Sequence, residues 1–287
     1  MKKKIFITGI SSQILSVLAL KIDASLYDIY GFTRDKNFRS PSPDIDMIYG
    51  DLLNESSYIA HIQDVDILIH GAAITHSSNK ASYYKVNYEA TKRLVDNAIA
   101  RGVKRFVFIS SNTAHPKNGA YSHSKHLAEA YIMSKCPSWH IYRISQVFGV
   151  KAKDEGIEKL IQQALQKRII LSPSGMSSKL YPIHAEDVAS NIIDNMLGSG
   201  TNLRADINGN VPFTYNSLID FIAEVANKRI LKVRLPKAML YAAKFVASIL
   251  PLGFVPDQVD RLYGKKTFSS NNQISITLED YIKTQLQ

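Results

Sequence analysis

The sequence predicts an α/β fold in which a doubly wound parallel sheet is joined to a smaller C-terminal lobe. Short apolar runs typical of buried strands alternate with helical patterns through the first half of the chain. The first run leads through a tight turn directly into a helix. After Gly149 the alternation becomes less regular. We therefore expect a main domain over residues 1–150 and a smaller lobe over residues 151–287, interleaved with returns to the main sheet.

Six strand-like runs predict the main sheet: residues 5–8, 29–33, 47–49, 66–69, 106–109 and 140–143. Helical patterns follow at residues 14–22, at residues 83–101 and around Tyr121. Strands that alternate with helices are joined by right-handed crossovers, which give a parallel sheet covered on both faces.

The second half of the chain predicts a helix at 157–167, a strand at 169–171 and a helix entered near Asp187. A helix at 215–227, a strand at 232–235 and an apolar helix from Pro236 follow, and then a polar C-terminal tail. We expect the apolar stripe of residues 236–252 to form part of the core of the lobe.

Composition limits the classes of function. The 287 residues are 45% hydrophobic, and the single cysteine, Cys136, excludes an intramolecular disulfide and favours a reducing compartment. The net charge of +10 comes from scattered lysines and arginines without a nucleic-acid motif, which favours small phosphorylated ligands over a polymer. The apolar residues 5–20 are interrupted by polar positions, and residues 238–250 include Lys244 and are too short to span a bilayer. We expect a cytoplasmic protein without an integral membrane segment.

Groups suited to carbonyl chemistry are concentrated between residues 106 and 129. The apolar run 106–109 delivers Ser110 and Ser111 to a loop, and Tyr121 and Lys125 follow at helical i, i+4 spacing, on one face. An ammonium beside a phenol favours the ionised form and lowers its pKa toward neutrality. The serine hydroxyl could hold the substrate oxygen.

Residues 121–129, YSHSKHLAE, resemble the YxxSKxxxE pattern of the extended, nucleotide-sugar branch of the short-chain dehydrogenase/reductase superfamily. The resemblance implies an NAD(P)-binding Rossmann domain followed by a substrate-binding lobe. It also implies a catalytic triad of Ser111, Tyr121 and Lys125.

The first turn departs from the TGxxGxxG pattern of that family, because residues 8–15 are TGISSQIL. Ser12 and Leu15 replace the glycines that allow the backbone to approach the pyrophosphate and the helix to pack closely. Ser12 could still offer its amide and hydroxyl to a phosphate, whereas Leu15 is harder to accommodate. With the HxAA-like residues 70–73 and the helix asparagine of the family, the resemblance implies these cofactor-binding residues: Thr8, Gly9, Ser11, Ser12, Gln13, Ile14, Thr33, Arg34, Asp51, Leu52, Gly71, Ala72, Ala73, Asn87, Ser110, Tyr121 and Lys125.

The tip of the second strand bears on the choice of cofactor. An acidic residue there would accept the ribose hydroxyls of NAD, whereas arginine suits the 2′-phosphate of NADP. Thr33 and Arg34 occupy the tip, so we expect NADPH, with NAD as the alternative because Asp35 could turn inward.

The resemblance implies a reductase that passes hydride to the carbonyl of a nucleotide-activated keto sugar, commonly at C4. Three alternatives remain: a nucleotide-sugar 4-epimerase with tightly bound NAD, a catalytically weak cofactor-binding or sensing protein, and an enzyme whose residues 236–252 dock a lipid-linked sugar or sterol. A 4,6-dehydratase is disfavoured, because Ser111-Asn112-Thr113 replaces the Thr-Asp-Glu of those enzymes. We expect a homodimer that includes the Tyr121 helix. The substrate contacts expected are Thr75, His76, Asn112, Thr113, Gln146 and Lys179.

Overall fold

The computed structural model has a main sheet of seven described strands, all parallel, in the order β10-β6-β5-β4-β1-β2-β3. The structure describes residues 2–149, 156–176, 178–196, 200, 202–247, 256–269 and 272–287. The predicted doubly wound α/β fold and its six strands are confirmed, and a seventh strand from the second half of the chain, whose residues were not assigned to a strand, extends the sheet. The strands are β1 (Lys3–Thr8), β2 (Tyr27–Thr33), β3 (Ile45–Tyr49), β4 (Ile67–His70), β5 (Arg105–Ser111), β6 (Trp139–Ile144) and β10 (Asn202–Ile207).

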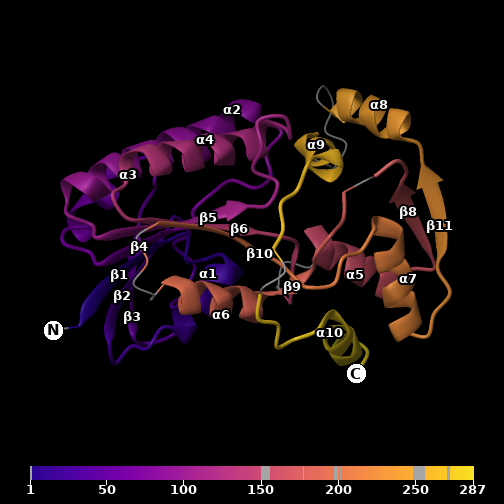
Figure 1. The fold of residues 1–287 in the computed structure, drawn as a ribbon, viewed down its shortest axis with the longest axis horizontal. Helices are drawn as coiled ribbons and strands as arrows, with labels where there is room; N and C mark the ends of the chain where they lie inside the picture. Colours follow the sequence, from indigo (N-terminus) through magenta and orange to yellow (C-terminus); the bar gives the residue numbers. More distant parts are fainter. Residues whose placement is uncertain are drawn as a thin grey trace.

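Helices cover both faces of this sheet (Figure 1). On one face lie α1 (Gln13–Lys21) and α6 (Ala185–Met196). On the other lie α2 (Lys80–Tyr83), α3 (Thr91–Ala100) and α4 (Ala120–Lys135). Each of the two helix layers packs on the sheet through its own apolar cluster, because the strands present buried side chains to both faces.

The helix expected over residues 83–101 is present without a break, but part of it is π-helical. A π-helical segment, η3 (Tyr84–Ala90), separates α2 from α3. Within it the amide side chain of Asn87 exchanges two hydrogen bonds with the backbone of Ile74, at 2.8 and 2.9 Å. These two bonds fix the loop that follows β4 against the π-helical segment. Two short 3₁₀ turns, η1 (Glu55–Ser57) and η2 (Ile59–His61), lie between β3 and β4.

The smaller lobe has its own apolar core. It contains α5 (Gly156–Gln166), α7 (Tyr215–Val225) and a two-stranded parallel sheet of β8 (Ile169–Pro173) and β11 (Leu231–Leu235). A second short pair, β7 (Val147–Phe148) and β9 (Ile183–His184), joins the lobe to the main sheet.

The C-terminal segment is not the polar tail that the sequence predicts. It contains α9 (Asp257–Tyr263) and α10 (Leu278–Gln285). Helix α10 buries Leu278 and Ile282 in the lobe core, so only its outer face is polar. Helix α9 lies against the N-terminus of α4 and places two charged side chains at the site described below.

Helix α8 (Lys237–Ala247) also differs from expectation. The predicted core stripe is wrong for this helix, because Met239 and Phe245 are 58% and 68% exposed. Residues 248–252 of the stripe lie outside the described residues. An apolar pattern shows that a helix has a face to cover, but not what covers it. Among the described residues, no helix combines the length and the apolarity needed to cross a membrane.

Candidate active site

A cleft of about 330 Å³ opens at the C-terminal ends of β1 to β4, where open α/β sheets bind ligands. Most of the predicted cofactor residues line it: Gly9, Ser11, Ser12, Thr33, Arg34, Asp51, Leu52, Gly71, Ala72 and Ala73. Asp35, considered above as the residue that would favour NAD, also lines it, and Phe32, Gly50, Ile74 and Val86, which were not predicted, complete the lining.

The turn after β1 keeps one indispensable glycine. Gly9 has φ +77°, and a Cβ there would lie 2.6 Å from the backbone nitrogen of Ala72. Ser12 caps α1, because its hydroxyl accepts a hydrogen bond from Leu15 N at 3.4 Å. The backbone nitrogen of Ser12 donates to the Gly9 carbonyl at 2.9 Å, so both the amide and the hydroxyl that we expected at a phosphate have partners within the turn.

Leu15 is accommodated by Gly71. A Cβ on Gly71 would lie 2.3 Å from a terminal methyl of Leu15, so the leucine side chain fills the space that a side chain at position 71 would take. Leu15 is buried and does not line the cleft. The missing third glycine is thus compensated on the neighbouring strand.

Other predicted cofactor residues lie beneath the cleft rather than in its wall. His70 is fully buried between the hydroxyls of Thr8 and Thr91, at 2.7 and 2.8 Å. Burial, reinforced by the charge of Lys125, lowers the pKa of His70 to about 3, so the ring is neutral. Asn87 is buried and positions the loop of Ile74. These residues support the cleft floor.

Two further predicted residues lie away from the cleft wall. Gln13 donates to the Gly149 carbonyl at 3.4 Å, and Ile14 packs against the apolar core beneath the sheet. Their contacts indicate a structural role at the start of α1.

The tip of β2 presents charges of both signs. Arg34 and Asp35 are exposed and line the cleft, while the buried Thr33 hydroxyl donates to Ser11 at 3.0 Å. Asp35 N donates to the Thr33 hydroxyl at 3.1 Å, which fixes the turn between them.

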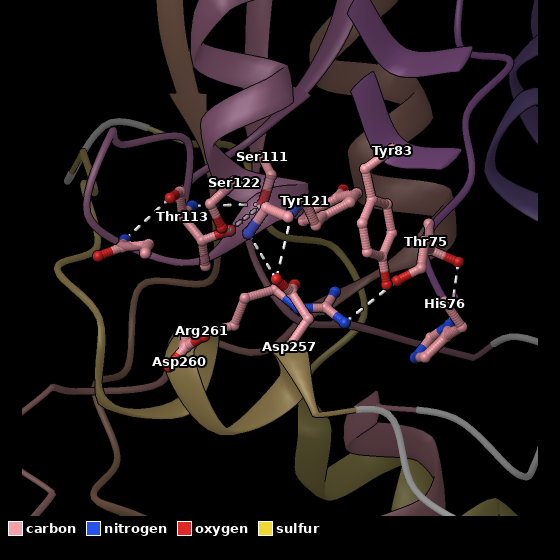
Figure 2. A network of polar contacts seen from close by, with 12 residues as sticks. Thr75, His76, Tyr83, Ser111, Thr113, Tyr121, Ser122, Asp257, Asp260 and Arg261 are labelled. Carbon is pink, nitrogen blue, oxygen red and sulfur yellow. Dashed lines mark hydrogen bonds and ion pairs between the residues drawn. The ribbon is translucent and has the colours of Figure 1, made fainter. Parts of the chain in front are cut away.

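The predicted triad lies where β5 meets α4, and Figure 2 shows Ser111 and Tyr121 of it. Ser111 ends β5, and its hydroxyl shares a hydrogen bond of 2.9 Å with that of Thr113. Tyr121 lies in the first turn of α4, and its side chain lines the same cavity as Ser111. Burial raises the pKa of Tyr121 above its usual 10, against the opposing effects of Arg261 and Ser111. The phenol is therefore protonated at neutral pH.

Lys125 does not interact with Tyr121 as we expected. Its ammonium donates to the Ile109 carbonyl at 2.6 Å and lies 3.9 Å from the centre of the Phe108 ring. Burial lowers the pKa of Lys125 to about 7, opposed by Glu129. In this structure Arg261, and not Lys125, lowers the Tyr121 pKa, because the Lys125 side chain points toward the sheet.

The last residue of the YxxSKxxxE pattern has a structural role. Glu129 is buried and forms an ion pair with Arg143 of β6, with a shortest distance of 2.6 Å. It also accepts a hydrogen bond of 2.5 Å from Ser110, a predicted cofactor residue that is consequently turned away from the cleft. The pair ties α4 to β5 and β6, which fixes the helix that holds Tyr121 and Lys125.

The contribution of α9 to the site was not predicted from the sequence. The guanidinium of Arg261 lies over the Tyr121 ring, 4.6 Å from its centre, and donates to the Thr75 carbonyl at 3.1 Å (Figure 2). Asp257 accepts hydrogen bonds from the backbone nitrogens of Ala120 and Tyr121, at 2.6 and 3.4 Å. It thereby caps α4, which has Gly119 at its start and no cap of its own.

A second cavity, of about 500 Å³, opens on the lobe side of Ser111 and Tyr121. Four of the predicted substrate residues line it: His76, Asn112, Thr113 and Gln146. Thr75 lies at its edge, with its hydroxyl bonded to His76 at 3.0 Å. Lys179 is exposed and does not line it. Three other cations do: Lys159, Arg261 and Lys266.

Comparison with known proteins gives matches in sequence and in structure. The model of the NAD dependent epimerase/dehydratase family matches residues 5–199. The mitochondrial NADH-ubiquinone oxidoreductase 40 kDa subunit of Neurospora crassa is 25% identical over 209 residues, which cover 71% of this chain and 52% of that protein. The chain thus spans about half the length of this curated relative.

Two solved structures share the fold at low sequence identity. The UDP-glucose 4-epimerase of Thermotoga maritima with UDP-glucose superposes with a TM-score of 0.75 at 15% identity, covering 99% of this chain and 97% of that chain. The enzyme WbmH of Bordetella bronchiseptica in complex with NAD⁺ gives a TM-score of 0.69 at 18% identity, covering 82% and 86%.

Proposed function

We propose that this chain, which belongs to the NAD dependent epimerase/dehydratase family, reduces the carbonyl group of a nucleotide-activated keto sugar with the hydride that a bound NADPH would supply. The observation that carries the proposal is the environment of Tyr121. Its side chain lines the substrate cavity together with Ser111, and burial raises its pKa. A phenol held in its protonated form is suited to donate a proton to a carbonyl oxygen that gains charge.

Each member of the triad has a part in this reaction. Tyr121 donates the proton, and Ser111 orients the carbonyl oxygen by a hydrogen bond. Lys125 follows Tyr121 by one helical turn, and its ammonium lies at the carbonyl of Ile109, two residues before Ser111. By family resemblance we assign Lys125 to the nicotinamide ribose.

The cleft fits the cofactor on three counts. Gly9 leaves no room for a Cβ beside the Ala72 backbone, and Leu15 is withdrawn against Gly71, out of the cleft. Arg34, exposed at the cleft edge, suits a 2′-phosphate. We therefore propose NADPH as the preferred cofactor. Replacement Arg34→Ala should raise the Kd for NADPH and leave that for NADH within twofold, while equal Kd values for both in the unaltered protein would contradict the preference.

The substrate cavity supports a nucleotide diphosphate. Arg261, Lys159 and Lys266 line it, and these cations match phosphate oxygens. Burial lowers the pKa of Lys266 to about 8, so a bound anion would also stabilise its charged form.

The decisive experiment combines cofactor binding with turnover. Tyr121→Phe should abolish reduction of nucleotide keto sugars while the Kd for NADPH stays within twofold. Ser111→Ala should lower kcat by about 10²-fold, as for loss of an oxyanion donor. Full turnover by Tyr121→Phe would refute the assignment.

A 4-epimerase that recycles NAD is the second candidate, because the fold matches a UDP-glucose 4-epimerase over nearly the whole chain. The two functions differ in the cofactor that the purified protein retains. Tightly held NAD and interconversion of nucleotide sugars without added cofactor would favour the epimerase. Exchangeable NADPH would favour the reductase.

We also propose a homodimer through α3 and α4. Their outer surface exposes Ile99 and Met133, at 42% and 36%. Sedimentation equilibrium of the protein and of Ile99→Glu/Met133→Glu tests this contact, since the double charge should yield monomers.

A further inference from the structure

The two-stranded sheet of the lobe presents an apolar surface to solvent. Its register pairs Leu231 with Ile169 and Val233 with Leu171, so these four side chains share one face. All four are exposed, from 40% to 62%, whereas Ile170, on the opposite face, is buried. We call these four residues the ribbon face. Single exposed apolar residues are ordinary, but four in adjacent cross-strand pairs form a contiguous patch.

Helix α8 continues this surface. Pro236 connects β11 directly to α8, which lies at the outer end of the lobe (Figure 1). Met239, Tyr241, Phe245 and Val246 are exposed on it, and none of the side chains described for this helix is buried. Its eleven residues span about 16 Å, enough to lie along a surface.

The charges around this surface are predominantly basic. Between Glu224 and Asp257 the sequence contains no carboxylate and six basic residues: Lys228, Arg229, Lys232, Arg234, Lys237 and Lys244. A further basic pair, Lys167 and Arg168, immediately precedes β8 and is exposed. Because β8 and β11 are parallel, this pair and the Lys228-Arg229 pair lie at the same end of the ribbon face. Lys232 and Lys244 form ion pairs with Asp220 and Asp260, while Arg229, Arg234 and Lys237 are exposed.

We infer that the ribbon face and α8 dock the protein on the surface of an anionic lipid bilayer. Apolar side chains ringed by arginines and lysines match the two components of such a surface, the acyl boundary and the anionic headgroups. A symmetric contact with a second copy of the chain fits less well, because it would bring these basic residues against one another.

Docking would also place the substrate cavity near the bilayer. Helix α8 is joined to α9 by the Lys244–Asp260 ion pair and by the Tyr241 and Tyr263 rings, 6.0 Å apart. Helix α9 provides Arg261 to that cavity. The inference itself does not depend on the proposed reaction.

The test is cosedimentation of the full chain with vesicles of phosphatidylcholine containing 30% phosphatidylserine, and with vesicles of phosphatidylcholine alone. We expect binding only to the anionic vesicles, weakened at 0.5 M NaCl because salt screens the cations. Absence of binding to the anionic vesicles would overturn the inference.

Two pairs of variants locate the contact. Leu231→Glu/Phe245→Glu should reduce binding at least tenfold, whereas Leu20→Glu/Leu26→Glu, which alters equally exposed leucines away from this surface, should not. Lys167→Gln/Arg229→Gln should weaken vesicle binding about 25-fold, because each cation near the membrane surface contributes roughly fivefold. The control Lys80→Gln/Lys135→Gln, which removes two exposed lysines elsewhere, should weaken it less. Thermal unfolding of each variant confirms that it is folded.

Equal binding by the variants and their controls would exclude this surface. The inference would also be overturned if the protein did not bind vesicles but formed a dimer that Leu231→Glu/Phe245→Glu dissociates. This surface would then be assigned to contact with a second copy of the chain.

Discussion

The side chain of Leu15 occupies the position that a Cβ of Gly71 would take, at 2.3 Å from it. One residue belongs to the helix after β1 and the other directly follows β4, the strand that pairs with β1. The large residue where the family has glycine is therefore matched by a small residue on the adjacent strand. Leu15 therefore stays buried outside the cofactor cleft although two glycines of the turn are missing.

This relationship predicts non-additive effects on stability. Leu15→Ala should lower the free energy of unfolding by about 2–5 kcal/mol by leaving a cavity. Gly71→Ala alone should cost about 1–3 kcal/mol by overpacking. The double variant should lose less than the sum, with a coupling of about 1–3 kcal/mol. Urea unfolding of the four proteins measures it, with Gly200→Ala as the control because a Cβ there meets nothing within 4 Å. Simple additivity would show that the two positions do not compensate each other.

The burial of Lys125 predicts a dependence of stability on pH. Its pKa falls from 10.5 to about 7 in the folded protein, so between these values the unfolded chain binds more protons. Stability should therefore rise with pH in this window, at most by about 1.4 kcal/mol per pH unit. Lys125→Met removes this term and should be more stable than the unaltered protein near pH 6, with a difference that shrinks toward pH 10.

Urea unfolding of the cofactor-free proteins at pH 6, 8 and 10 provides the comparison, in which other titrating groups cancel. Lys135→Met, at the exposed end of the same helix, should run parallel to the unaltered protein. If Lys125→Met also ran parallel, the ammonium would not be desolvated as the structure indicates.

The sequence predicted what is encoded locally. The strands of the main sheet follow from contiguous apolar runs, and the spacing of Tyr121 and Lys125 follows from one helix. The direction of the Lys125 side chain did not follow, because it depends on the Ile109 carbonyl and the Phe108 ring of a neighbouring strand.

Contacts between distant segments were not predictable from one sequence. Asp257 and Arg261 reach Tyr121 from more than 130 residues away, on a short helix in a segment that looked like a polar tail. The exposure of α8 was missed for a different reason, since a buried and a docking helix share the same apolar pattern. The sequence does not distinguish Lys179, which lies outside the cavity, from Lys266, which lines it. Only the packing of the folded chain does.

Asp257 caps α4 from a distant part of the sequence, so its replacement should destabilise the folded protein strongly. Asp257→Ala should lower the free energy of unfolding by about 2–4 kcal/mol, since it frees two backbone donors and leaves the Arg261 charge without its buried partner at 3.2 Å. Asp257→Asn keeps one acceptor and should cost less. Asp260→Ala on the same helix is the matched control, and an equal loss there would mean that only the helix, and not the cap, matters.

The position of Arg261 over the Tyr121 ring predicts a shift in the pH profile of the reaction. Its charge lowers the Tyr121 pKa, so Arg261→Met should raise that pKa and move the alkaline limb of kcat/KM to higher pH. It should also lower kcat/KM at neutral pH by about tenfold, through loss of a charge-assisted contact with the substrate. Arg261→Lys keeps the charge and should leave the limb near its original pH, although its ammonium lacks the planar fork of arginine. Arg234→Met, an exposed arginine outside the cavity, should change neither quantity. An alkaline limb that stays fixed in Arg261→Met would mean that this charge does not act on the phenol that donates the proton.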